Sequence, residues 1–89
     1  MDHERLGTLY DHLAATGERP VDRAASRWLG EAEAVAKDAL TDGLDPSVRR
    51  ERVAQIPHLL DNVEETGDEV ADDHVAAAEA ILDALLAEE

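Results

Sequence analysis

Aliphatic residues recur at intervals of three or four along nearly the whole chain, which is the pattern of helices that bury one face. Glycines interrupt this pattern at Gly17, Gly43 and Gly67, and each follows a stretch of helical periodicity. Because helices commonly end on a glycine in the left-handed conformation, three such stops predict four helices. No segment alternates polar and apolar residues over the length of a strand. The pattern therefore predicts an all-α fold, a compact bundle of about four helices in a single domain spanning residues 1–89.

Each expected helix has a recognisable start. The first helix is expected over about 2–16, and the second begins near Asp22. The third has the clearest signal, with Asp45 as N-cap and Pro46 at the first helical position, and the fourth starts between Glu69 and Asp73. The residues expected on the inward faces are Leu6, Leu9, Tyr10 and Leu13, then Ala25, Trp28, Ala32, Val35, Ala36, Ala39 and Leu40, then Val48, Val53, Ile56, Leu59, Leu60 and Val63, and last Val75, Ala78, Ile81, Leu82 and Leu85.

The third apolar stripe continues in helical register through Pro57. A proline inside a helix removes one backbone hydrogen bond and costs about 3 kcal/mol when the helix stays straight. We therefore expect the third helix to be kinked, or to have a short break, near Pro57.

The balance of charged residues indicates the environment in which the protein works. The chain has 22 acidic and 8 basic residues, a formal net charge of −14, and Lys37 as its one lysine. Salt screens such repulsion, because the Debye length falls from about 30 Å at 0.01 M to about 3 Å at 1 M. Exposed carboxylates also keep a protein soluble. The composition predicts a halophilic, cytoplasmic protein; the alternative is an acidic protein of an ordinary cytoplasm.

Several kinds of chemistry are absent from the sequence. Without cysteine there are no disulfides and no thiolate metal sites. No apolar run approaches the roughly 20 residues of a membrane helix, and the first residues do not resemble a signal peptide. No phosphate-binding glycine loop or serine nucleophile motif is present. We therefore expect no membrane association, no cofactor and no enzymatic activity.

Metal-binding patterns fail on spacing. No Glu-x-x-His pair occurs, although helical di-iron sites need one to direct two ligands at one ion. The pairs Asp61-x-x-Glu64 and Glu69-x-x-Asp72 have the spacing of magnesium ligands in the all-α nucleotide pyrophosphohydrolases, but the second helix offers no matching pair. We expect no metal site, and a solvated acidic face instead.

Six of the eight basic residues fall in two short stretches. Two interpretations remain open: the arginines form ion-pair networks with nearby carboxylates, or they form a patch beside Trp28 that receives an acidic partner or nucleic acid. The two stretches contain Arg19, Arg23 and Arg27 at helical spacing, and Arg49, Arg50 and Arg52 at the start of the third helix.

A bundle of 89 residues with Trp28 and Tyr10 as its aromatic residues has a thin core, and pairing two copies is a common way to enlarge it. We therefore expect a homodimer, and a function as a non-enzymatic protein–protein interaction module for itself or an unidentified protein. The alternative is a small regulatory protein that contacts nucleic acid through the arginine patch, against which the net charge of −14 argues. The partner-binding residues expected are Trp28, Leu29, Arg23, Arg27, Arg49, Arg50, Leu82, Leu85 and Leu86.

Two stretches, ASRWLGEAEAVAKDAL at 25–40 and RERVAQIPHLLDNVEETG at 50–67, carry a resemblance together with the overall composition. The whole chain resembles the short, acidic, helical proteins that recur in haloarchaea. The resemblance implies a helical protein of a salt-rich cytoplasm, and it implies no activity, cofactor or site.

Overall fold

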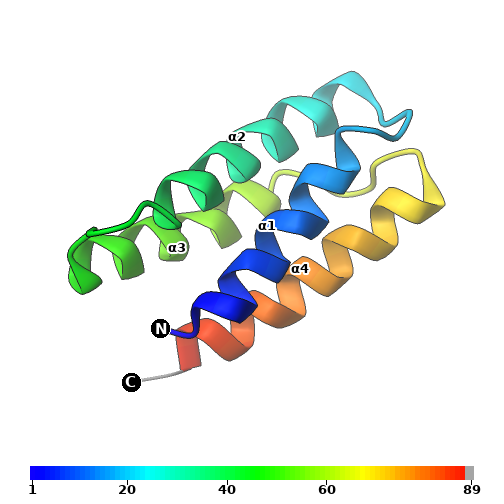
Figure 1. Cartoon of the computed structure of the whole chain (residues 1–89). Coiled ribbons are helices and arrows are strands. Elements are labelled where there is room, and N and C mark those ends of the chain that lie inside the picture. The colour runs from blue at the N-terminus through cyan, green and yellow to red at the C-terminus, as the bar shows by residue number, and fades with distance from the viewer. Residues whose placement is uncertain (88–89) are drawn as a thin grey trace.

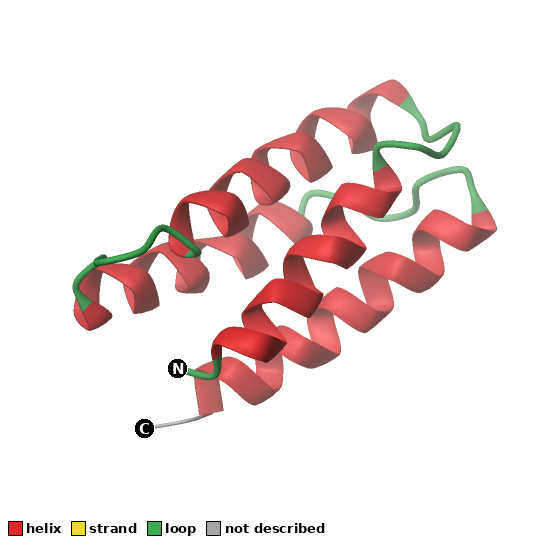
Figure 2. Ribbon diagram, viewed as in Figure 1, coloured by secondary structure: helices red, strands yellow, loops and turns green. Residues whose placement is uncertain are grey.

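A computed structural model describes residues 1–87, and in these residues the chain forms four helices and no strand (Figure 2). The helices are α1 (His3–Thr16), α2 (Arg23–Ala39), α3 (Pro46–Leu60) and α4 (Glu69–Ala87). They form an elongated bundle of about 36 × 20 × 19 Å (Figure 1). The expectation of a small all-α bundle is confirmed.

The bundle consists of two closely packed helix pairs. α1 packs mainly against α4, and α2 packs mainly against α3 (Figure 1). Smaller contacts of α1 with α2 and of α3 with α4 join the two pairs around a common core. Leucines and alanines dominate that core: Leu6, Leu9, Leu13, Ala25, Leu29, Ala32, Ala36, Ala39, Val53, Ile56, Leu60, Val75, Ala78, Leu82 and Leu85.

The buried face of α2 differs from the expected one by one position. Leu29 lies in the core with 2% of its surface exposed, whereas the side chain of Trp28 is only partly buried. Ala25, Leu29, Ala32 and Ala36 follow one another at intervals of three and four, so they define the centre of the stripe. Trp28 lies about 100° away from Leu29 around the helix, on the flank of that stripe.

Carboxylates occupy the expected starts of the helices. The side chain of Asp45 accepts a hydrogen bond from the backbone N–H of Ser47 at 2.9 Å, which caps α3. The Ser47 hydroxyl and this N–H, in that order, lower the pKa of Asp45. Asp2 caps α1 in the same way, accepting from the N–H of Glu4 at 2.9 Å. Asp22 stands at the N-cap position of α2 but makes no side-chain capping bond.

None of the three glycines is a left-handed helix cap. Gly43 and Gly67 have φ of 79° and 82°, in the left-handed region where glycine is favoured, but they lie in the loops, because α2 and α3 end on the right-handed caps Leu40 and Asp61. The expectation of a left-handed cap at Gly17 is wrong, because its φ is −68°. There the chain continues in a right-handed turn, and the N–H of Gly17 donates to the carbonyl of Ala14 at 3.1 Å.

α3 runs without a break through Pro57 and ends one turn later, at Leu60. A short break before Pro57 is therefore not present. Pro57 has no N–H, so the carbonyl of Val53, four residues earlier, lacks the helical donor that another residue would supply. Val63, which the sequence pattern placed on the third helix, lies beyond its end.

Two loops meet at one end of the bundle. The N–H of Asp22, before α2, donates to the carbonyl of Thr66, before α4, at 2.7 Å. In the same region the guanidinium of Arg19 donates to both carboxylate oxygens of Asp68, at 2.9 and 3.1 Å. This bond, with a further one from the N–H of Ala71, lowers the pKa of Asp68. The loops thus tie the α1–α4 pair to the α2–α3 pair.

Candidate interaction surface

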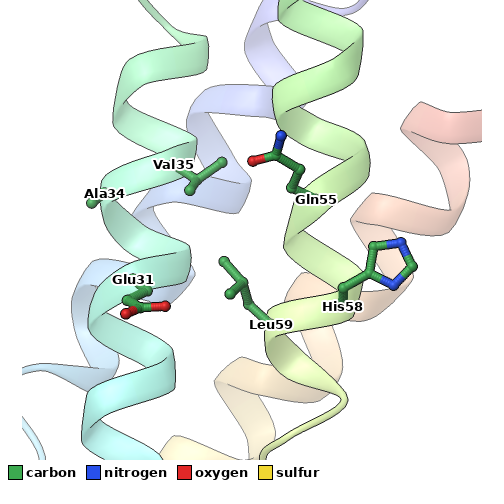
Figure 3. Close-up of a pocket in the computed structure, with 6 residues that line it drawn as sticks. All are labelled: Glu31, Ala34, Val35, Gln55, His58 and Leu59. Carbon is green, nitrogen blue, oxygen red and sulfur yellow. The ribbon is translucent and has the colours of Figure 1, made fainter.

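An open groove of about 500 Å³ runs along the outer side of the α2–α3 pair, and we call it the α2/α3 groove (Figure 3). Val35 and Leu59 extend toward one another across it, and His58 points away from α2 (Figure 3). Both aliphatic side chains rest partly on the core and partly in solvent. The residues that line the groove are Glu31, Ala34 and Val35 of α2 and Gln55, His58 and Leu59 of α3.

Trp28 extends the apolar flank of α2 beyond this groove. It precedes Val35 by seven residues, which is close to two helical turns, so both side chains leave the helix on the same side. The guanidinium carbon of Arg27 lies 5.6 Å from the centre of the Trp28 ring. Such a cation–π contact at an exposed site contributes about 0.5–1 kcal/mol, and it restricts the motion of both side chains.

The charges beside the groove are balanced. Arg27 and Glu31 stand one turn apart on α2, and Arg52 of α3 lies 3.9 Å from the carboxylate of Asp38. Elsewhere the described surface is dominated by acid: none of the Asp and Glu side chains among residues 1–87 is buried, and all except Glu33 and Asp68 are exposed. The groove therefore combines apolar lining with little net charge, on a molecule whose formal charge is −14.

Comparison with known proteins gives a family for this chain. The model of a family described as a domain of unknown function, DUF8152, matches residues 5–89. The chain belongs to this family. No curated protein and no solved structure matches it. Family membership thus brings no assigned activity.

Two arginines of the third helix, Arg49 and Arg50, donate hydrogen bonds to backbone carbonyls. Arg49 is 8% exposed, and it donates from Nε to the carbonyl of Ala39 at 2.8 Å and from Nη2 to that of Thr41 at 2.9 Å. Arg50 donates from Nη2 to the carbonyl of Leu86 at 2.7 Å. The two residues thus satisfy carbonyls at the C-terminal ends of α2 and α4. Neither open interpretation anticipated these carbonyl bonds, whereas Arg19 and Arg52 do form ion pairs of the expected kind, with Asp68 and Asp38.

The apolar residues expected at a shared surface are not brought together. Leu29, Leu82 and Leu85 are core residues, with 2%, 2% and 0% of their surfaces exposed. Leu86 is partly buried against that core. The helices that carry these residues also do not meet, because α2 and α4 form no contacting pair among the described residues. The expectation of a surface built from these leucines and Trp28 is therefore corrected, and only Trp28 lies beside the groove.

The sequence pattern missed the groove because its apolar members were assigned to the core. Val35 and Leu59 do touch the core, yet each stands at the edge of its helical stripe. The available signal was Ala34, an apolar residue next to Val35 and outside the stripe. Arg23 and Arg27, at the start of α2, are exposed as the sequence suggested.

The described residues also bear on metal binding and on membrane insertion. No group of three or more His, Cys, Asp and Glu side chains among residues 1–87 is arranged to hold a metal ion. None of the helices in this part of the chain combines the length and the apolar character needed to cross a membrane.

Proposed function

We propose that this protein is a non-enzymatic interaction module that pairs with a second copy of itself through the α2/α3 groove. The observation that carries the proposal is an open apolar groove whose flanking charges cancel, on a molecule with a formal charge of −14. Two such molecules repel each other over most of their surfaces, because nearly all acidic side chains of residues 1–87 are exposed. The groove offers a second copy an apolar lining with charges of both signs beside it.

The charge pattern along α2 also suits a symmetric pair. In a twofold interface the same patch of the two copies meets in opposite orientation. When that patch carries a positive and a negative residue, the positive residue of one copy can lie against the negative residue of the other. Arg27 and Glu31, one turn apart, supply opposite charges at such a spacing. Trp28 beside them belongs, like arginine, to the residue types enriched in interface hot spots.

We propose a salt-adapted cytoplasm as the setting of this module. Support comes from the exposure of the acidic side chains and from the resemblance to short acidic proteins of haloarchaea. In molar salt the Debye length is only about 3 Å, so long-range repulsion between two acidic copies is nearly removed. Salt also strengthens the burial of apolar surface such as the groove lining.

Contact with nucleic acid through an arginine patch has less support. Arg49 and Arg50 already donate to the carbonyls of Ala39, Thr41 and Leu86. Phosphate contacts would also have to overcome the net charge of −14, and they weaken steeply with salt.

The test is sedimentation at about 2 M KCl and tens of micromolar protein. The wild type should sediment as a dimer, and its Trp28 fluorescence should change on dilution. Ala34→Arg places a long charged side chain in the groove without touching the core, since Ala34 is exposed, and should give a monomer with unchanged helix content.

Ala76→Arg is the matched control, because Ala76 is exposed on α4, away from the groove, and the change in charge is the same. This variant should remain a dimer. A monomeric wild type, or an Ala34→Arg variant that still pairs, would overturn the proposal. Trp28→Ala should weaken the dimer as well.

A further inference from the structure

Two histidines meet between α1 and α4, the helix pair that does not carry the α2/α3 groove. The Nδ1 atoms of His12 and His74 lie 2.9 Å apart, although the residues are 62 positions apart in the chain. The ring centroids are 5.2 Å apart and the ring planes are tilted by 47°. Both side chains are partly buried, so the contact is held between the helices and remains accessible to solvent.

Only one hydrogen fits between these nitrogens. A neutral imidazole has one nitrogen that donates and one that accepts, so a bond between two Nδ1 atoms requires one ring of each tautomer. When both rings carry their hydrogen on Nε2, both Nδ1 atoms present a lone pair while they lie 2.9 Å apart. Two unprotonated imidazole nitrogens at this separation can serve as two ligands of one metal ion.

We propose that His12 and His74 bind one divalent transition-metal ion of the Ni²⁺, Cu²⁺ and Zn²⁺ class through their Nδ1 atoms. Imidazole nitrogens stand about 2.0–2.1 Å from such an ion, so two ligands at a right angle are about 2.9 Å apart. The observed 2.9 Å separation therefore matches neighbouring positions of an octahedral or square-planar ion. Imidazole favours these metals over Mg²⁺ and Ca²⁺, which take oxygen ligands.

The surroundings leave room for the rest of the coordination shell. The residues one turn from His12 that are not buried are Thr8 and Ala15, and those one turn from His74 are Val70 and Ala77. These side chains are short, so water can complete the shell around a half-exposed ion. The net charge of −14 also raises the concentration of cations at the surface. Because the described residues offer no third protein ligand, the site is a two-histidine clamp.

Metal binding at this place would join α1 to α4. In the unfolded chain the two rings are separated by 62 positions, so the ion binds the folded state preferentially and stabilises it. The clamp lies between α1 and α4, whereas the α2/α3 groove lies on the other helix pair, so it does not depend on the proposed pairing of two copies.

The test is thermal unfolding in about 2 M KCl with about 1 mM Ni²⁺, compared with the same concentration of Mg²⁺. Ni²⁺ should raise the Tm of the wild type by about 4 °C or more, and Mg²⁺ should not. His12→Asn and His74→Asn should abolish the rise, because an amide replaces the hydrogen bond of Nδ1 but is a poor ligand for these metals. His3→Asn and His58→Asn are matched controls that should retain it.

A second measurement does not depend on the stability of the variants. Nuclear magnetic resonance of the wild type should show that paramagnetic Ni²⁺ broadens the ring signals of His12 and His74 before that of His58. An equal response to Ni²⁺ and Mg²⁺, an unchanged response in either asparagine variant, or broadening of all histidines alike would overturn the proposal.

Discussion

Arg49 stabilises the end of α2 from within the bundle. Its planar guanidinium donates in two directions, to the carbonyls of Ala39 and Thr41. These carbonyls have no helical N–H to accept from, because α2 ends at Ala39. A residue with one donor direction cannot satisfy both carbonyls at once. The charge of Arg49 therefore contributes through donors placed at the negative end of the α2 dipole.

Arg49→Met should lower the free energy of unfolding by about 2–3 kcal/mol, because both charge-assisted hydrogen bonds are lost while the aliphatic stem is kept. Arg49→Lys should recover only part of this loss. Urea denaturation at fixed high salt measures the effect, and Arg23→Met, at an exposed position of α2, should change stability by less than about 0.5 kcal/mol. Equal effects of the two methionine variants would show that the carbonyl contacts contribute nothing.

The role of Arg49 was out of reach of the sequence for a physical reason. Counting charges identifies carboxylate partners, but the partners of Arg49 are backbone carbonyls 10 and 8 residues earlier, and every residue has a carbonyl. The same limit applies to His12 and His74. Spacing rules detect ligands on one helix, whereas these two rings converge from helices distant in the chain.

At the scale of elements, Gly67 joins the two loops at one end of the bundle. Its φ of 82° already disfavours other residues. A Cβ built on Gly67 would also lie 2.7 Å from a carboxylate oxygen of Asp22, which is closer than side chains approach. Gly30, by contrast, lies inside α2 with nothing within 4 Å of such a Cβ.

These two glycines give opposite expectations. Gly67→Ala should lower the free energy of unfolding by about 1–3 kcal/mol, chiefly because it adds backbone strain at a φ of 82°, and it also forces the exposed carboxylate of Asp22 to move. Gly30→Ala should raise it by about 1 kcal/mol, since alanine is the better helix former in open space. Chemical denaturation of the two variants beside the wild type tests both, and stabilisation by Gly67→Ala would contradict the close approach of the loops.

The elements themselves were largely predictable, because caps and periodicity are local. Asp45 followed by Pro46 located the start of α3, and the glycines separated the helices. The errors concern features that depend on neighbours. Gly17 keeps a right-handed turn, and α2 and α3 end at Leu40 and Asp61, before the glycines that were expected to cap them.

At the scale of the whole molecule, charge opposes compaction. Carboxylates cover the described surface, and 22 acidic residues outnumber 8 basic ones in the sequence. The core that resists this repulsion consists mainly of leucine and alanine. Salt that screens the surface therefore acts on a small margin of stability.

Helix content and Tm should rise steeply as KCl increases from tens of millimolar to above about 1 M. Circular dichroism during thermal unfolding measures both quantities. Sucrose, an uncharged solute that is excluded from protein surfaces, is the control, and it should stabilise less because it does not screen charge. A flat response to KCl over this range would contradict the proposed adaptation to salt.

The composition predicts this salt dependence, but it does not show where the α2/α3 groove lies. Val35 and Leu59 look like core residues in the sequence, and only their places at the edges of α2 and α3 leave them partly exposed. Likewise, the sequence placed Trp28 in the centre of the stripe that Leu29 occupies. On α2, neighbouring positions in the sequence thus differ between the core, at Leu29, and the flank beside the groove, at Trp28.

The pairing of the helices has a consequence for the order of folding. α2 and α3 are neighbours in the chain and pack together, so their contacts close only a short loop. α1 and α4 lie at opposite ends of the described chain, and bringing them together closes a far longer loop at a greater entropic cost. The α2–α3 hairpin is therefore the natural nucleus, and α1 and α4 close onto it afterwards. Substitutions on the α1–α4 side should then mainly accelerate unfolding, while those between α2 and α3 should slow folding.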